Sequence, residues 1–233
     1  MSSATSGARA RARVEVTAAI KDEARRQLAA DGAAKLSLRA VARELGMVSS
    51  ALYRYFPSRD ELLTALIIDA YDSLGAAAES AHAELPQSAA PVLRWTVVCE
   101  AVRSWALAHP HEYALIYGSP VPGYIAPEST VESATRVALL LIEIVRDAHR
   151  GRGIAVQPLP DELRTEAERI AADLAPELPP AVHMAMVAAW AQLFGLVGFE
   201  VFGQFNRVVE DRSAFFSYAA TQLAHGVGLL EQK

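Results

Sequence analysis

Two short helical patterns separated by a glycine, between residues 36 and 59, constrain the fold of this chain more than any other feature. In the first, Leu38 and Val41 recur at helical spacing, and Ser37 before them is a good N-cap residue. Gly46 follows at the point where a helix end favours a residue that tolerates positive φ. The pattern predicts a short helix that ends in a tight turn.

A second apolar stripe follows the turn, and Pro57 ends it. Its members are Ala51, Leu52, Tyr55 and Phe56. Two helices of about two turns each, joined by a turn that contains glycine, are typical of a helix-turn-helix. In that motif the second helix is the one presented to the major groove of DNA.

Eight outward residues of this motif are hydrogen-bond donors, and none of these eight is acidic. Arginine can bond bidentately to guanine, and serine and tyrosine hydroxyls suit phosphates. The alternative is a surface pair of helices whose arginines and tyrosines are merely solvated. The residues predicted to contact DNA are Ser37, Arg39, Ser49, Ser50, Tyr53, Arg54, Tyr55 and Arg59. The last of them would stand at the start of the next helix, where free backbone amides favour a phosphate.

The order of residues in this stretch resembles the TetR family of bacterial transcriptional regulators. The elements that match are Ser37, Val41-Ala42, Leu45-Gly46-Met47, Leu52-Tyr53-Arg54-Tyr55-Phe56 and Arg59, within a resemblance that spans positions 14–63. One position departs from the family pattern. The serine that caps the recognition helix in the family falls on Val48, which cannot cap, and Ser49 is the alternative cap one residue later.

The charge of the chain is divided unequally. The whole chain carries a net charge of −5, but residues 1–59 hold eleven Lys or Arg against five Asp or Glu, which is +6. The remainder holds eleven basic and twenty-two acidic residues, which is −11. A basic N-terminal part on an acidic body is the asymmetry expected of a DNA-binding module attached to a separate regulatory domain.

Composition predicts an all-α fold with two domains. Hydrophobic residues make up 52% of the 233 residues, aromatic residues only 7%, and long alternating strand patterns are absent. We expect residues 1–12 to form a disordered basic arm and residues 13–60 a three-helix helix-turn-helix domain. Residues 61–233 would form a larger helical domain for effector binding and dimerisation. Within it, Pro160 is expected at the first position of a helix.

Nothing in the sequence predicts secretion or a membrane anchor. The single cysteine, Cys99, excludes an intrachain disulfide and favours a cytoplasmic protein. Residues 1–13 lack the apolar stretch of a signal peptide. The longest apolar run, Met184 to Gly203, contains Gln192 and Glu200, so we interpret it as a buried helix rather than a membrane span.

A second, looser resemblance lies in the C-terminal part. Trp105, His109-Pro110, Tyr113 and Gly118 are similar to the Trp-His-Gly type of TetR C-terminal domain. That resemblance implies an effector cavity enclosed by three helices that carry several aromatic residues. The alternative is that these aromatic residues form ordinary core. The candidate effector-binding residues are Trp95, Cys99, Trp105, Tyr113, Tyr117, Trp190 and Phe194. Few of them can carry a charge, which favours an apolar or aromatic effector.

The last two predicted helices, about 180–205 and 211–230, are candidates for a dimer interface. The first is apolar nearly all round, so it must be covered on all sides. Gly195 and Gly198 would allow a neighbouring helix to approach closely. Family resemblance implies that both helices pair with their copies in a homodimer, which binding to two half-sites of DNA also requires. The alternative is that they form only the core of the monomer.

No catalytic, cofactor or metal motif is present. The chain lacks a G-x-S-x-G elbow, a P-loop and an H-E-x-x-H motif, and His109 and His111 have no third ligand nearby in sequence. We therefore expect a ligand-responsive, non-enzymatic regulator, a repressor released from a palindromic operator. One alternative is a small-molecule-binding or enzymatic helical protein with a purely structural helix-turn-helix. An activator, which would use the same module, is the other.

Overall fold

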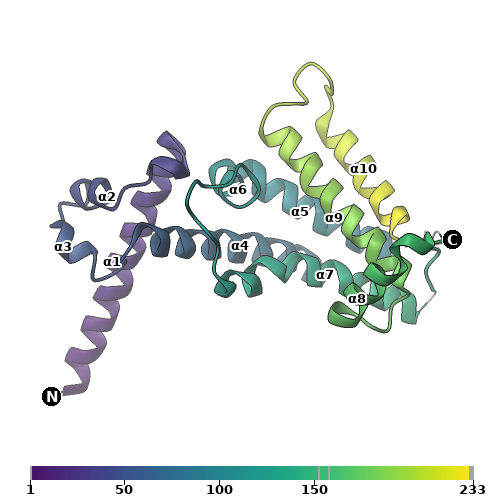
Figure 1. Ribbon diagram of the computed structural model, residues 1–233, viewed down its shortest axis with the longest axis horizontal. Helices are drawn as coiled ribbons and strands as arrows, with labels where there is room; N and C mark the ends of the chain where they lie inside the picture. Colours follow the sequence, from purple (N-terminus) through teal and green to yellow (C-terminus); the bar gives the residue numbers. More distant parts are fainter. Residues whose placement is uncertain (1, 152, 157, 231–233) are drawn as a thin grey trace. The chain divides into compact units, whose positions relative to one another are not determined.

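The computed structural model describes residues 2–151, 153–156 and 158–230, with residues 2–6 and 8 described by their backbone alone (Figure 1). All regular elements within those residues are helices, so the predicted all-α fold is confirmed. The chain divides into two compact units. Unit 1 is Met1–Tyr71 with His109–Val131, and unit 2 is Asp72–Ala108 with Glu132–Lys233.

Unit 1 contains the helix-turn-helix and its supporting helices. Its elements are α1 (Ser2–Asp31), η1 (Ala33–Lys35), α2 (Leu38–Glu44), α3 (Ser49–Leu52), the first half of α4 (Arg59–Ala83), α6 (Pro110–Tyr117) and η2 (Glu128–Thr130). Buried side chains from α1, α2, α3 and α4 share one hydrophobic core, in which Ile20, Val41, Leu52 and Leu62 are each 0% exposed. The predicted inward faces of these helices therefore meet as expected.

The structure differs from the sequence analysis at the N-terminus and at the domain boundary. Helix α1 begins at Ser2, so residues 2–12, expected as a disordered arm, are helical; residue 1 lies outside the described part. Alanine and arginine are both strong helix formers, which explains why the helix extends beyond its packed part. The boundary falls within α4, after Tyr71, rather than at residue 60.

Unit 2 is built from long helices that pack in pairs. Helix α10 packs against α5 and α9, and α8 packs against α9. The elements are the second half of α4, α5 (Pro91–Ala108), α7 (Val131–Arg150), η3 (Asp161–Leu163), α8 (Arg164–Leu174), α9 (Pro180–Val201) and α10 (Arg212–Gly226). Pro160 precedes η3 and does not open α8, which starts at Arg164, so the prediction for that proline was wrong.

A charged pair lies inside this helical packing. The Arg103 guanidinium donates to both carboxylate oxygens of Glu200, at 2.6 and 2.7 Å, and Glu200 is only 8% exposed. The same guanidinium lies 5.4 Å from the centre of the Phe216 ring. A bidentate pair of this kind satisfies a carboxylate that would be costly to bury alone. It joins α5, α9 and α10.

Within the described residues, α9 is the one helix whose length and composition would also suit a membrane span, and 39% of its apolar window is buried. Core helices of soluble proteins pass the same test. The sequence predicts that this helix is buried. Its Glu200 is paired inside the protein, but most of the apolar window is not covered by the described part of the chain.

Candidate nucleic-acid interface

The first helix of the motif, α2, begins and ends as its sequence predicts. The backbone N–H of Ala40 donates to the Ser37 hydroxyl at 3.4 Å, so Ser37 is the N-cap. The turn after α2 contains Gly46, whose φ of 64° lies in the left-handed region that favours glycine. The N–H of Met47 closes this turn on the carbonyl of Ala42 at 2.8 Å.

The second helix, α3, is shorter than expected and starts in an unusual way. It has four residues, Ser49–Leu52, followed by further turns up to Tyr55. Val48 is its N-cap and makes no side-chain cap, so the alternative cap by Ser49 is not adopted. The Val48 carbonyl nevertheless accepts from the N–H of Ala51 at 2.9 Å, which begins the helix. The hydroxyls of Ser49 and Ser50 are left on exposed residues.

Most of the predicted contact residues are exposed around these two helices. Tyr53 is 40% exposed, whereas Ser37 and Tyr55 are half-buried. The exposed positions are Arg39, Ser49, Ser50, Tyr53 and Arg54. A hollow of about 370 Å³ lies beside them and is lined by Leu36, Ser37, Leu38, Arg39, Tyr53, Ser58 and Arg59. Hydroxyl and guanidinium groups in this lining can bond to a phosphate.

Arg59 is the first residue of α4, as expected, but its guanidinium bonds to backbone carbonyls of the same unit. Nε donates to the carbonyl oxygen of Leu36 at 3.2 Å, and Nη2 donates to those of Ala33 and Ala34 at 2.8 and 3.2 Å. These bonds fasten η1 to the start of α4, and Nη1 lies 3.6 Å from a carboxylate oxygen of Asp60. Ser58, the N-cap of α4, accepts from the N–H of Glu61 at 3.1 Å.

Arg59→Gln is therefore expected to lower stability rather than DNA affinity. Hydrogen bonds from a charged donor contribute about 1.5–3 kcal/mol, so the free energy of unfolding should fall by about 1–3 kcal/mol. The dependence of DNA affinity on salt should stay the same, because no phosphate contact is lost. Urea unfolding and DNA titration at several salt concentrations measure the two effects. An unchanged stability with a weaker salt dependence would contradict this assignment.

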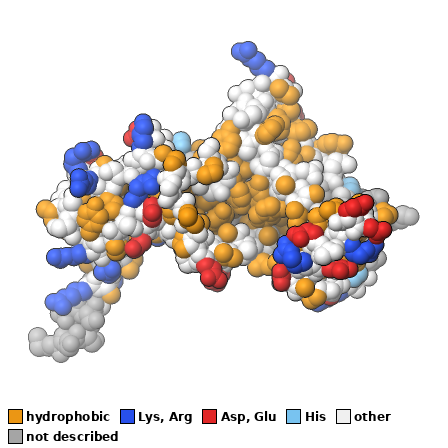
Figure 2. Space-filling model, in the orientation of Figure 1, with side chains coloured by type: hydrophobic (Ala, Val, Ile, Leu, Met, Phe, Trp, Pro, Cys, Tyr) orange, Lys and Arg blue, Asp and Glu red, His pale blue; other side chains and the backbone are white. Residues whose placement is uncertain are grey.

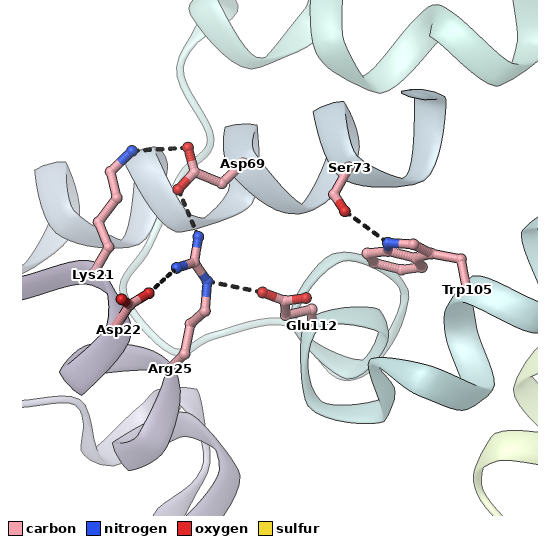
Figure 3. Close-up of polar contacts among 7 residues, drawn as sticks. All are labelled: Lys21, Asp22, Arg25, Asp69, Ser73, Trp105 and Glu112. Atoms are coloured by element: carbon pink, nitrogen blue, oxygen red, sulfur yellow. Dashed lines mark hydrogen bonds and ion pairs between the residues drawn. The ribbon is translucent and has the colours of Figure 1, made fainter. Parts of the chain in front are cut away.

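Unit 1 also contains an ion-pair cluster that the sequence analysis missed (Figure 3). The Arg25 guanidinium of α1 contacts Asp22 at 2.8 Å, Asp69 of α4 at 2.7 Å and Glu112 of α6 at 2.9 Å. Lys21 of α1 contacts Asp69 as well, at 2.8 Å. Because the partners lie on three helices far apart in the sequence, no local spacing could have indicated them. The cluster ties α1 to both α4 and α6.

The candidate effector residues fall into both units, and each group is a set of packed aromatic residues. In unit 1, the rings of Tyr113 and Tyr117 lie 5.2 Å apart, and burial raises the pKa of both hydroxyls. Tyr71 lies 5.9 Å from Tyr117 and donates to the carbonyl of Ile116 at 3.5 Å. Tyr71 was not among the predicted residues, although its helical position facing inward could have suggested it.

In unit 2, the five other candidates are largely buried. Trp190 and Phe194 lie one turn apart on α9, with ring centres 4.4 Å apart. Burial strongly raises the pKa of the Cys99 thiol, so the thiol stays protonated. The indole N–H of Trp105 donates to the Ser73 hydroxyl at 2.9 Å (Figure 3). By contrast, the indole N–H of Trp95, which is 1% exposed, has no hydrogen-bond partner among the described residues.

A capped helix-turn-helix with exposed Arg, Tyr and Ser side chains, followed by a separate helical unit, defines a DNA-binding transcriptional regulator. Residues 20–66 match the family described as bacterial regulatory proteins, tetR family. Residues 95–223 match the tetracyclin repressor-like C-terminal domain. The chain belongs to the TetR family of bacterial transcriptional regulators. That is a non-enzymatic class; the Trp-His-Gly subtype stays a prediction.

Similar proteins support this membership along most of the chain. The HTH-type transcriptional regulator Rv1816 of Mycobacterium tuberculosis is 39% identical over 212 residues, 86% of each chain. The crystal structure of the regulatory protein SCO4313 is 32% identical with a TM-score of 0.76, covering 92% of this chain and 98% of that chain. A protein of unknown function from Rhodococcus sp. RHA1 is 25% identical with a TM-score of 0.70, covering 91% and 95%.

Proposed function

We propose that this regulator is a homodimeric repressor that occupies a palindromic operator and leaves it when a small apolar or aromatic effector binds. The observation that carries the proposal is the exposure of Arg39 on α2 and of Tyr53 and Arg54 directly after α3, next to helices whose inner faces are buried. A rigid helix pair that presents donors outward can hold them in fixed register against DNA. The anchors Val41 and Leu52, each 0% exposed, supply that rigidity.

The homodimer is supported by an exposed apolar face in unit 2 (Figure 2). On α9, Val187 is 48% and Phe199 is 54% exposed; on α10, Tyr218 is 63% exposed. We expected a neighbouring helix to pack closely against Gly195. A Cβ built at Gly195 would meet nothing within 4 Å, so no helix in the described part of its own chain does so. An apolar face of this kind favours association with a second copy.

The effector would bind among the candidates of unit 2 and would need a hydrogen-bond acceptor. A buried N–H without a partner costs about 1–3 kcal/mol. The indole N–H of Trp95 has no partner among the described residues. A largely apolar molecule with a carbonyl, ether or hydroxyl oxygen at this point would satisfy it. The effector is therefore expected to be apolar or aromatic with at least one acceptor.

Trp95→Phe is expected to weaken effector binding about two- to tenfold, since a net hydrogen bond contributes about 0.5–1.5 kcal/mol. Compounds found in a small-molecule screen are titrated, and the release of operator DNA measures their affinity. The wild type should bind a carbonyl compound more tightly than its hydrocarbon analogue, and Trp95→Phe should bind both equally. Trp105→Phe is the matched control, because the Trp105 N–H already has Ser73 as its partner. An unchanged difference in Trp95→Phe would contradict the role of Trp95.

We propose that the ion-pair cluster of unit 1 carries part of the response. Arg25 bonds to Glu112 of α6 and to Asp69 of α4 at the same time. A shift of α6 on effector binding would therefore change the forces on α1, which packs against α2 in the helix-turn-helix. Coupling energies of about 1–3 kcal/mol are typical of allosteric proteins and would be enough to lower operator occupancy.

Binding of the purified protein to fragmented host DNA at controlled salt, followed by sequencing of the bound fragments, tests the function. A single enriched palindrome is the expected result. Transcription in vitro from the promoter next to that palindrome should fall when the protein is added and recover with effector. Increased transcription would instead support an activator. No enrichment, even after refolding from denaturant to remove bound ligand, would favour a purely structural helix-turn-helix.

A further inference from the structure

The first turns of α1 extend beyond the hydrophobic core of unit 1 and carry only positive charge. Val16 is the first residue of α1 that packs against this core. Before it, Arg9, Arg11 and Arg13 are exposed, and no acidic residue precedes Glu15. In Figure 1 these turns extend past α2 and α3, and Figure 2 shows Lys and Arg side chains along them. The extension adds a basic edge to the DNA-binding unit.

Two of these arginines lie on the side of α1 that faces the helix-turn-helix. At about 100° per residue, Arg9 and Arg13 are about 40° apart, in line with the partly buried Val16 and the buried Ile20, whereas Arg11 points about 160° away. The Arg13 guanidinium lies 5.2 Å from the centre of the Tyr55 ring, directly after the recognition helix. Arg9 lies one turn, about 6 Å, further along the helix.

We propose that Arg9, with Arg13 beside it, forms a second phosphate-binding edge that contacts the DNA backbone next to the half-site read by α3. The proposal rests on the proposed docking of α3 in the major groove. The Arg13–Tyr55 contact fixes this edge relative to the recognition helix. Arg9 lies further out on the same face of α1, and no acidic residue in the extension can neutralise its charge. A row of arginines without acidic neighbours matches the charge of a DNA backbone.

If this helix end is only solvated, every exposed arginine on it should affect DNA affinity equally. If one side of the helix contacts DNA, the arginine on that side should affect DNA affinity more. Arg9 and Arg11 have the same charge, are exposed on the same helix and are two residues apart. They lie on opposite sides of the helix, and Arg11 has Glu15 one turn further along on its side, whereas Arg9 has Arg13. Arg11 is therefore the matched control for Arg9.

The test compares Arg9→Gln and Arg11→Gln in the full-length protein, using binding to the operator and to a random duplex at 50–200 mM salt. Each lost phosphate contact lowers the slope of log K against log salt by about 0.9, so Arg9→Gln should lower it by about 1.8 in a dimer. The ratio of wild-type to variant affinity should then shrink about tenfold between 50 and 200 mM salt. Arg11→Gln should leave the slope nearly unchanged.

Equal slopes for wild type and Arg9→Gln, or equal losses for the two variants, would overturn the proposal. A loss for Arg9→Gln on the operator alone would also overturn it, because phosphate contacts do not depend on sequence. Circular dichroism of both variants checks that α1 stays helical. If wild type does not prefer any operator over random DNA, the proposed regulatory function fails. The slopes on random DNA would still decide whether Arg9 contacts phosphates.

Discussion

Arg54→Ala is expected to abolish specific operator binding while leaving the fold and the dimer intact. Arg54 is exposed at the end of the recognition helix, and removing its side chain takes nothing from the core. A bidentate contact between arginine and a guanine discriminates by about 1–3 kcal/mol, and a dimer loses two of them. Operator affinity should therefore fall by about 2–6 kcal/mol, which is roughly 30-fold to more than 10⁴-fold. Fluorescence anisotropy with labelled operator measures this loss.

Tyr53→Ala should act in the same direction, because Tyr53 lines the hollow beside Arg39 and is 40% exposed. Arg169→Ala is the matched control for both variants. The Arg169 side chain is 62% exposed on α8 of unit 2 and pairs with the exposed Glu166 of the same helix, at 2.6 Å. Thermal unfolding and sedimentation should be unchanged for Arg54→Ala. Full operator affinity in Arg54→Ala or Tyr53→Ala would show that the corresponding residue has no part in binding.

The local features of the DNA-binding unit could be predicted from sequence because short-range chemistry determines them. A serine hydroxyl or an aspartate carboxylate three residues before a backbone amide can cap a helix, and Ser37, Ser58 and Asp211 all do so here. The positive φ of Gly46 likewise follows from the turn itself. Helical periodicity then identified the buried faces, since positions three and four apart must share a side.

Features that depend on residues distant in sequence could not be predicted. From its place in the sequence, Arg59 has the properties of a phosphate ligand. In the folded protein its guanidinium donates to the carbonyls of Ala33 and Ala34, which are distant in sequence. The contacts of Arg25 with Asp69 and Glu112 depend on the packing of three helices. The helical extension of α1 was missed for another reason. A segment rich in serine, alanine and arginine lacks an apolar stripe, so hydrophobic periodicity does not indicate a helix there.

The second large effect is expected from Phe199→Glu in the apolar face of α9. Phe199 is 54% exposed in a single chain, so a second copy must cover it if the proposed dimer forms. Two-fold symmetry puts two carboxylates into the interface, and burying an unpaired carboxylate costs several kcal/mol. The variant should sediment as a monomer at micromolar concentration. Its operator affinity should fall by about two orders of magnitude or more, because the second half-site is no longer bound as part of one molecule.

Two controls separate loss of the interface from loss of the fold. Leu107→Glu introduces the same charge at a 42% exposed leucine of α5, outside α9 and α10, and should leave the dimer intact. Phe199→Leu keeps an apolar side chain while removing the ring contact with Phe205, whose centre lies 5.7 Å away, and should also remain dimeric. If Phe199→Glu stays dimeric with wild-type thermal stability, the dimer forms through another surface. The exposed apolar face of α9 would then need a different partner to cover it.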